Sequence, residues 1–372
     1  MSMAAERART TPIEPDRLEG FSLPREVDGL FGHEAALGEF HDALQSGRMH
    51  HAWLIVGPEG IGKATLAYRF ARTVLAEGER GDARQGLDRD HPVFRKVAAL
   101  SHPNLLLIRR SWVEKSKRYS QWIGVEEVRR LRAFLGHSAG EGGWRVVVVD
   151  RADELNQNAA NALLKALEEP PPKTLFLLIS SAEGRLPVTI RSRARILRVA
   201  ALGEEDVEKA VVAALDRDGH KADADTLSAA IALSQGSVRR ALELVSSAGI
   251  ELYGEILAAL GGLPEIDGTR LHRLVDRLAG ASDSERLDLY LALLLGLIER
   301  MIRFTATGAG ASAAERKLAG RLLSPATLAS WAEAWEAISE AKAEAQALNL
   351  DRGLLLLESW FRLQQVAREH PV

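Results

Sequence analysis

Four short, continuous apolar runs lie in the first two thirds of the chain, at residues 52–56, 105–108, 146–149 and 175–179. They are unbroken rather than alternating, which is typical of strands in a parallel sheet that is covered on both faces. Patterns with helical periodicity separate them, over residues 63–75, 125–135 and 156–168. This alternation predicts the α/β fold class, with an open, doubly wound parallel sheet.

The β signal ends after residue 200, and helical patterns follow. Residues 203–248 are predicted to form a small group of helices, and a Gly- and Pro-containing linker lies near residues 261–268. The chain is then helical over about 271–366, with breaks near 308–310 and 324–325. We expect four parts. A polar lead-in covers residues 1–27 and is mobile or extended over 1–25. It is followed by a nucleotide-binding-type core at 28–202, a helical domain at 203–262 and a further helical domain at 263–372. Residues 77–103 show little periodicity and are predicted to be an insertion or a loop.

Composition narrows the class of protein. The 372 residues are 46% hydrophobic and 27% charged, as in a globular protein of two or three domains. A net charge of -3 argues against a wholesale electrostatic nucleic-acid binder. The chain has no cysteine, which excludes disulfides and cysteine-ligated zinc and fits a reducing compartment. It has neither an apolar signal region nor an apolar run of about 18 residues, so we expect no membrane insertion and a cytoplasmic location.

The segment GPEGIGKAT at residues 57–65 is a phosphate-binding loop that lacks one part. Its glycines let the backbone approach phosphates closely: Gly57, Gly60 and Gly62. Lys63 reaches the terminal phosphates, but Ala64 stands where a Ser or Thr ligates Mg²⁺. Thr65, one residue further on, can contact a phosphate but is not at the metal position. The segment predicts a degenerate nucleotide site, and the alternative is a Gly-rich turn that binds no nucleotide.

The acid Asp150 ends the run of four valines at residues 146–149. At the carboxyl end of a buried strand it is placed to hold the Mg²⁺ shell, although it can also be an ordinary strand cap. ATP-hydrolysing proteins commonly have an acid next to it that orients water, but here Arg151 follows, and a cation cannot act as a general base. Glu154 is the remaining substitute. Two defects at separate catalytic positions favour a degenerate hydrolysis site.

Two further segments are rich in arginine. The segment TIRSRARILR at residues 189–198 contains four arginines, and one of them can project into a neighbouring subunit's phosphate site. The alternative is a solvated basic edge or a contact to a phosphate backbone. In GSVRRAL at residues 236–242, Arg239 lies in the first turn of a helix, where the helix dipole disfavours a cation. This indicates a role beyond helix stability, with a solvated arginine as the alternative.

Taken together, these segments resemble the clamp-loader branch of the AAA+ family. The string ELNQNAANALLKALEEPPP at residues 154–172, followed at this distance by TIRSR, is the most specific part. The segments at 57–65, 146–153, 236–242, 115–131 and 349–363 also look like this family. The resemblance covers roughly residues 28–365.

The resemblance implies an AAA+ P-loop core, a helical lid at 203–262 and a helical collar domain at 263–372 that assembles a hetero-pentameric ring. It implies partnership with the motor (gamma/tau) subunits and the delta subunit of DNA polymerase III, in a ring that loads the sliding clamp onto primed DNA. Arg193, with Ser192, falls on the family's arginine-finger motif and would complete a neighbour's ATP site. Arg239 falls on the lid's sensor arginine, and Ser180 or Ser181 lies near the sensor-1 position.

Departures from the family point away from its motor subunits. Ala64 and Arg151 remove the metal hydroxyl and the catalytic acid, and Ala194 replaces the cysteine of the finger motif. The family's four-cysteine zinc module is absent, so we expect no zinc and no other metal, with ATP or ADP at a degenerate site as the only candidate cofactor. The chain is then a non-hydrolysing subunit that supplies Arg193 in trans.

Other hypotheses stay open. An autonomous AAA+ ATPase, either the loader's motor or a helicase-loader-like enzyme, would need Thr65 and Glu154 to replace the missing groups. A purely structural ring scaffold would use neither nucleotide nor finger. DNA contact through the basic residues at 115–118 is a further hypothesis. No paired-carboxylate pattern for two-metal polymerase chemistry is found.

Overall fold

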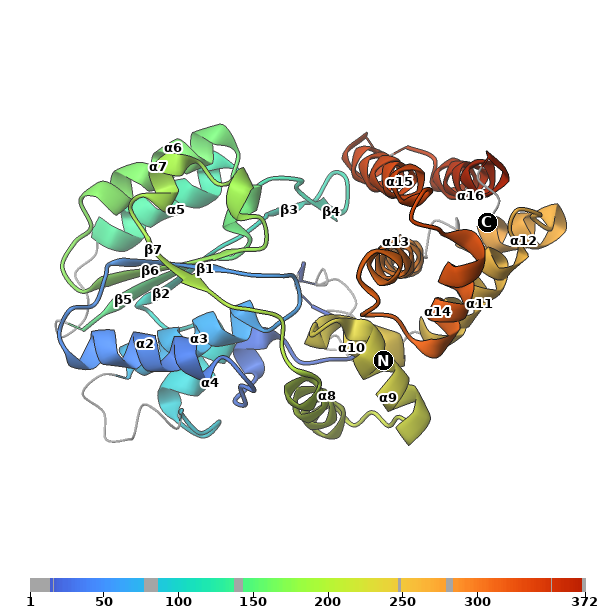
Figure 1. The fold of residues 1–372 in the computed structure, drawn as a ribbon. Coiled ribbons are helices and arrows are strands. Elements are labelled where there is room, and N and C mark those ends of the chain that lie inside the picture. Colours follow the sequence, from blue (N-terminus) through green and yellow to red (C-terminus); the bar gives the residue numbers. More distant parts are fainter. Residues whose placement is uncertain are drawn as a thin grey trace, which may run out of the picture. The chain divides into compact units, whose positions relative to one another are not determined.

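The computed structural model describes residues 14–15, 17–76, 86–136, 143–246, 249–278, 284–348 and 350–369. It divides into two compact units, Met1–Leu242 and Glu243–Val372, and each unit is described by itself. Figure 1 shows the elements of both.

A five-stranded sheet forms the centre of the first unit, with the order β2-β5-β6-β1-β7 and parallel pairing throughout (Figure 1). Its strands are β1 (Ala52–Val56), β2 (Leu105–Ile108), β5 (Arg145–Val149), β6 (Thr174–Ser180) and β7 (Arg195–Arg198). A separate two-stranded ribbon joins β3 (Trp112–Val113) to β4 (Arg118–Tyr119). The predicted α/β class with a doubly wound parallel sheet is confirmed.

Helices cover both faces of this sheet. The helices of the first unit are α2 (Glu34–Gln45), α3 (Lys63–Leu75), α4 (Pro92–Ala98), α5 (Val125–Gly136), α6 (Gln157–Glu168), α7 (Val188–Arg191), α8 (Glu204–Asp218), α9 (Ala224–Ser234) and α10 (Val238–Ser246), the last of which runs past the boundary between the units. One buried cluster joins α2, α3 and α4 to one face, and a second joins α5 and α6 to the other. Two covered faces explain why the strands are continuous apolar runs.

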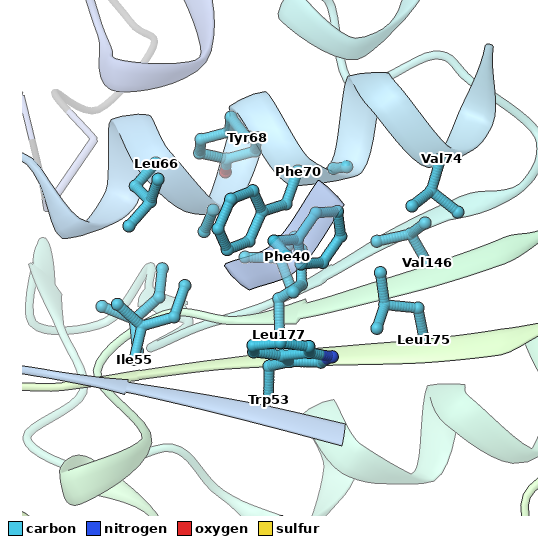
Figure 2. Packing of buried hydrophobic residues seen from close by; sticks show 14 of the residues in the cluster. Phe40, Trp53, Ile55, Leu66, Tyr68, Phe70, Val74, Val146, Leu175 and Leu177 are labelled. Atoms are coloured by element: carbon cyan, nitrogen blue, oxygen red, sulfur yellow. The ribbon is translucent and has the colours of Figure 1, made fainter. Parts of the chain in front are cut away.

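Alternation along β1 shows how one strand serves both clusters. Trp53 and Ile55 pack on the side of α2 and α3, whereas Leu54 and Val56 pack on the side of α5 and α6. Figure 2 shows the first of these clusters, in which Phe40 stacks on Phe70 with ring centroids 3.7 Å apart. Burial of each such side chain stabilises the fold by about 1.5–3 kcal/mol, so both helical layers hold the strand in place.

Strand β7 was not predicted. Only four strands were expected, the last at 175–179, but residues 195–198 form a fifth that pairs with β1. The strand lies at the sheet's edge, and its two exposed arginines flank the more buried Ile196 and Leu197. A half-exposed edge strand carries a weak apolar signal, which is the reason for the miss.

The lead-in was expected to be mobile or extended over 1–25; over residues 17–25 it is packed, so the mobile alternative does not hold there, and Leu23 has an extended backbone. Phe21 and Leu23 are each 3% exposed. The Ser22 N–H donates to Asp218 Oδ2 at 3.1 Å, and Arg25 makes an ion pair with Glu14 at 2.5 Å. Residues 1–13 and 16 lie outside the described residues.

The segment at 77–103 is not simply a loop. Residues 77–85 lie outside the described part of the chain, but Pro92–Ala98 forms α4, with Val93, Phe94 and Val97 buried. Pro92 opens this helix, and the His91 side chain accepts a hydrogen bond from the Val93 N–H at its N-terminus. A helix of seven residues is too short to produce a clear periodicity, so it was not predicted; that the segment is an insertion stays a prediction.

The second unit is helical in all its described elements. These are α11 (Gly249–Gly262), α12 (Gly268–Leu278), α13 (Ser284–Thr307), α14 (Ala313–Leu322), α15 (Leu328–Leu348) and α16 (Arg352–Glu369). The helix breaks predicted near 308–310 and 324–325 are confirmed. Helix α11 packs against α13 and α14, and the boundary between the compact units falls at Leu242 rather than at the linker near 262. The four-part division of the chain stays a prediction.

A buried polar triad ties three helices of the second unit together. Glu315 on α14 accepts hydrogen bonds from Tyr253 on α11 at 2.6 Å and from Arg300 on α13 at 2.7 Å. Glu315 is 1% exposed, and its side chain also accepts from the Ser312 N–H in a capping box. Burial alone would raise the pKa of Glu315, but these hydrogen bonds and the Arg300 charge outweigh it and hold the pKa below its ordinary 4.5.

Among the described residues, no single helix combines the length and the apolar character needed to cross a membrane. The bent pair of α10 and α11 passes that test together, by length and composition only.

The triad generates a stability prediction. Glu315→Gln removes the charge that compensates the buried Arg300, so we expect the free energy of unfolding of the second unit to fall by about 3 kcal/mol. Chemical denaturation of the full chain, followed by circular dichroism, measures this. The folded carboxyl has a lowered pKa, so its contribution is present above about pH 4.5 and is lost as the pH falls through the folded pKa.

The matched control is Glu333→Gln, at an exposed position on α15. It should change stability by no more than about 0.5 kcal/mol. Equal effects of the two substitutions would show that the buried triad does not hold the helices together.

Candidate nucleotide site and arginine edge

The loop after β1 is closely packed against its surroundings. A Cβ added to Gly57 would lie 2.2 Å from the backbone oxygen of Val199, so only glycine fits there. Gly60 has a φ of +78°, and an added Cβ would lie 2.2 Å from Ser237 Oγ. Gly62 is the N-cap residue of α3. The strand–loop–helix arrangement that the motif requires is therefore present, with the N-terminus of α3 facing the loop.

Lys63 is held by the loop that precedes it. Its Nζ donates hydrogen bonds to the carbonyl oxygens of Gly57, at 2.8 Å, and of Pro58, and to Ser181 Oγ at 2.9 Å. The residue is 5% exposed, and this burial is the main cause that lowers the pKa of Lys63 to about 8. The charges of Glu59 and Asp153 partly oppose the shift. The lysine is thus a buried cation at the N-terminus of α3.

Two further residues contribute here: Ser181, which was named near the sensor-1 position, and Asp153, which was not singled out. Ser181, one residue past β6, contacts Lys63 and donates its backbone N–H to Asp153 Oδ1 at 3.2 Å. Asp153 is 8% exposed. Of the two serines near the sensor position, Ser181 is the one in contact with the lysine, because Ser180 is buried and accepts from the Ala182 N–H. The carboxyl ends of parallel strands meet at one edge of the sheet, and this rule could have indicated that Ser181 and Asp153 lie near the loop.

Arg151 occupies the position of the expected catalytic acid. It has a φ of +57°, and its guanidinium makes ion pairs with Glu59 of the loop at 3.3 Å and with Glu154 at 2.8 Å. Burial alone would lower the pKa of Arg151, but the charges of these two acids outweigh it and raise the pKa. The loop and the turn after β5 are therefore connected through a cation.

Glu154, the remaining candidate for a base, is engaged elsewhere. It pairs with Arg151 and also with Arg110 at 3.0 Å, and its side chain is 15% exposed. Burial is the main cause that raises the pKa of Glu154, against the two arginine charges. Its carboxylate is not among the groups that line the cavity at the loop.

A cavity of about 260 Å³ lies beside the loop, within the first unit. Its polar lining includes Glu59, Lys63, Thr65, Asp150 and Arg151. Its apolar lining comes from the N-terminal segment and from the helices after the sheet, with Leu18, Phe21, Leu30, Ala214 and Leu242. Apolar side chains combined with a few charged groups are typical of sites for small molecules.

Arg239 also lines this cavity. Its backbone N–H donates to the Gly60 carbonyl at 3.1 Å, so the first turn of α10 rests on the tip of the loop. The structure thus brings together the candidate nucleotide-binding residues, which are Gly57, Gly60, Gly62, Lys63, Thr65, Asp150 and Arg239. What they bind remains a prediction.

The residues present do not suit a magnesium ion. Ala64 lies at the cavity wall but has no oxygen to offer. The charge of Asp150 acts on Lys63 and on Arg151, so this carboxylate already compensates two cations in part. Among the described residues, no group of three or more His, Asp or Glu side chains is arranged to hold a metal ion.

The arginine edge, defined as Arg191, Arg193, Arg195 and Arg198, surrounds β7 and is not part of the cavity. Each of its members has an acidic partner. Arg195 pairs with Glu39 at 2.7 Å and lies over the Trp53 ring, with Cζ 4.7 Å from the ring centroid. Arg191 and Arg198 both reach Glu183, at 4.0 and 2.8 Å.

Ser192 and Arg193 lie between α7 and β7. Arg193 donates to the Thr189 carbonyl at 3.0 Å and pairs with Glu168, at the end of α6, at 2.8 Å. Ser192 Oγ also donates to Thr189 O, at 3.1 Å. The side chains of the Arg193–Glu168 pair are 36% and 49% exposed, so solvent screens it and its contribution is small. The expected finger is thus separate from the chain's own cavity.

The basic residues at 115–118 lie in the turn and on the second strand of the β3–β4 ribbon, and all of them are exposed. Trp112 and Tyr119 pack across the ribbon with ring centroids 5.2 Å apart. DNA contact at this ribbon stays a prediction.

Comparisons with known proteins agree on one family. Residues 32–203 match the family model described as DNA polymerase III, delta subunit. DNA polymerase III subunit delta' of Pseudomonas aeruginosa is 40% identical over 143 residues, which cover 38% of this chain and 41% of that protein. Subunit delta' of Escherichia coli is 37% identical over 202 residues, covering 54% and 56%.

A gamma subunit is also similar. DNA polymerase III subunit gamma of Buchnera aphidicola is 28% identical over 247 residues, which cover 65% of each chain. The chain spans between 41% and 65% of the length of these relatives. The resemblance to the clamp-loader family is confirmed, and higher identities fall on the delta-prime type of subunit than on the gamma type.

The buried lysine generates a prediction about titration. In NMR spectra of protein labelled with ¹³C at lysine Cε, one resonance should titrate near pH 8, because burial disfavours the charged amine of Lys63. The resonance should vanish in Lys63→Arg, which assigns it. If every lysine instead titrates above about pH 10, Lys63 is not buried as described.

Proposed function

Because the chain resembles the delta-prime type of DNA polymerase III clamp-loader subunit, we propose that it serves as that subunit in its own replication machinery. It sits in a hetero-pentameric ring with motor (gamma/tau) subunits and a delta subunit, in the cytoplasm. Through this complex it acts with the sliding clamp and primed DNA. The lid and collar are the parts at 203–262 and 263–372.

The proposal is carried by one observation: the cavity residues and the Ser192–Arg193 pair lie apart in the chain. The chain's own cavity lacks the hydroxyl and the acid needed for hydrolysis, whereas the Ser192–Arg193 pair lies outside it on an exposed edge. A guanidinium in that place can reach into a neighbour's nucleotide site and stabilise charge there. This arrangement supports a finger supplied in trans.

The exposed partner Glu168 fits the same role. Because the ion pair is screened by water, Arg193 can leave it at little cost when a subunit with bound nucleotide approaches. The pair then keeps the guanidinium oriented in the free chain without trapping it.

Loss of hydrolysis by this chain follows from the cavity's chemistry. Ala64 cannot ligate Mg²⁺, and Arg151 cannot take a proton from water. Glu154 is held by two arginines, so it does not replace the missing acid. This counts against the second candidate, an autonomous AAA+ ATPase.

The finger is tested in the reconstituted loader. Arg193→Ala should lower clamp- and primed-DNA-stimulated ATP turnover about tenfold or more, because a transition-state charge loses its partner. Size-exclusion chromatography shows whether the ring still assembles. Arg198→Ala is the matched control, since it removes an arginine from the same edge. Unchanged turnover in Arg193→Ala would leave the chain as a scaffold without a finger.

A second experiment separates this subunit from an ATPase. Asp150→Asn should leave the turnover of the reconstituted loader within about twofold of the wild type, because hydrolysis occurs at other subunits. The purified chain alone should show no turnover. Turnover by the chain alone that Asp150→Asn abolishes would favour the autonomous enzyme.

A further inference from the structure

The segment at residues 17–28 runs between the core of the first unit and the end of α8, and we call it the strap. One end of the strap is fastened to the core by a buried cation of α3. Arg72, which is 1% exposed, donates hydrogen bonds to the carbonyl oxygens of Arg25 at 3.3 Å and of Val27 at 2.9 Å. A buried guanidinium that lost these acceptors would be left desolvated, so this end of the strap is fixed.

Further contacts strengthen the same end. Arg69, one turn before on α3, donates to the Asp28 carbonyl at 3.1 Å. Arg25 Nε donates to the carbonyl of Ala98, at the end of α4, at 2.8 Å, and its guanidinium pairs with Glu14 at 2.5 Å. The strap is therefore joined to two helices of the core.

The other end of the strap contacts the C-terminus of α8. That helix ends at Gly219, whose φ of +76° is left-handed, and the turn presents Asp218 and His220 on either side of it. The Ser22 N–H donates to Asp218 Oδ2 at 3.1 Å, and Ser22 Oγ donates to Oδ1 of the same carboxylate. His220 Nε2 donates to the Gly20 carbonyl at 2.7 Å.

An aromatic contact lies between these two sets of hydrogen bonds. Phe21 is 3% exposed, and its ring centroid lies 4.6 Å from that of His220. Three successive strap residues therefore contact α8 or the turn after it, through a charged acceptor, a ring and a backbone carbonyl. Hydrogen bonds to a charged group are stronger than those between neutral groups.

The place of this contact decides what it can do. Residues 199–203 connect β7 to the start of α8, where an added Cβ on Gly32 would lie 2.6 Å from Leu202 Cδ2. Helix α8 has 15 residues, so the strap holds it about 22 Å from that connection. At the start of α10, the Arg239 N–H donates to the Gly60 carbonyl at 3.1 Å. Contacts at both ends of α8 oppose its rotation about the connection.

We propose that the strap is a conformational lock, which holds the far end of α8 so that α8, α9 and α10 keep one orientation on the core through the chain's own contacts. Release of the strap leaves residues 199–203 free to act as a hinge. The inference goes beyond the proposed function and does not depend on it, because it involves neither ATP chemistry nor another subunit.

A distance measurement on the full chain tests the lock. The chain has no cysteine, so spin labels can be attached to Asp42→Cys on α2 and Asp225→Cys on α9, both at exposed positions. Pulsed electron–electron double resonance should give one narrow distance distribution. Asp218→Ala combined with His220→Ala removes the strap's partners, so the distribution should become about twofold wider or gain a second distance.

Two further variants make the result specific. Asp216→Ala combined with Lys221→Ala is the matched control, because it changes two exposed residues beside the contact and should leave the distribution unchanged. Gly20→Ala acts from the strap itself. Gly20 has a φ of +83°, and an added Cβ would lie 3.1 Å from His220 Nε2, so this variant should also widen the distribution. It keeps the test open if the double variant of α8 does not fold.

Hydrogen exchange separates a lock from a local cap. Exchange of the α8 amides should rise about tenfold in the strap variants, since charged hydrogen bonds are lost. If exchange rises but the distance distribution stays as in the wild type, the strap only caps α8 and the inference is wrong. It is equally wrong if neither quantity changes. Arg193→Ala should leave the distance unaltered, so the finger and the lock are tested separately.

Discussion

Parallel pairing of β1 with β6, and of β6 with β5, is the constraint on which the candidate site depends. The register sets Val56 opposite Ser180 and Val149 opposite Leu178, so three strands end at the same edge. The phosphate loop, Asp150 and Ser181 follow those three ends. A register shift of one residue would turn every apolar side chain to the other face. The two buried layers that fix the register therefore also fix the distance between Lys63 and Ser181.

Within this frame, the candidate site places two cations, the buried Lys63 and the partly exposed Arg151, among acidic side chains. Lys63 is desolvated, and Arg151 lies near enough to lower the pKa of Lys63 further, while Glu59, Asp150 and Asp153 act in the opposite direction. An arginine in this position therefore needs its own acids, and Glu59 and Glu154 provide them. The replacement of the catalytic acid and the engagement of Glu154 are thus parts of one electrostatic arrangement.

The fold could be predicted from the sequence where burial is uniform. Four strands were found because both faces of each are covered, while β7 was missed because water reaches half of its side chains. Helix α4 was missed because its seven residues, about two turns, are too few to show a clear helical period. The packing of Phe21 and Leu23 was missed because two apolar residues in a polar, proline-containing segment show no pattern.

The candidate site, too, could be predicted only in part. The spacing of the glycines and the lysine was enough to predict the loop, because these residues lie close together in sequence. The contacts of Lys63 with Ser181 and of Arg193 with Glu168 join residues far apart in the chain, so they depend on the strand order. The pairing of Arg151 with both Glu59 and Glu154 depends in addition on the left-handed backbone at Arg151, which no propensity predicts.

The separation between cavity and edge means that substitutions in one need not disturb the other. The loop, Asp150 and Ser181 follow the ends of β1, β5 and β6, whereas Arg193 lies between α7 and β7 and contacts Thr189, Ser192 and Glu168. Substitutions that do not share contacts act independently on stability and on binding. Ala64 and Arg151 can therefore change the chain's own ligand chemistry while the orientation of Arg193, set by Thr189 and Glu168, is preserved.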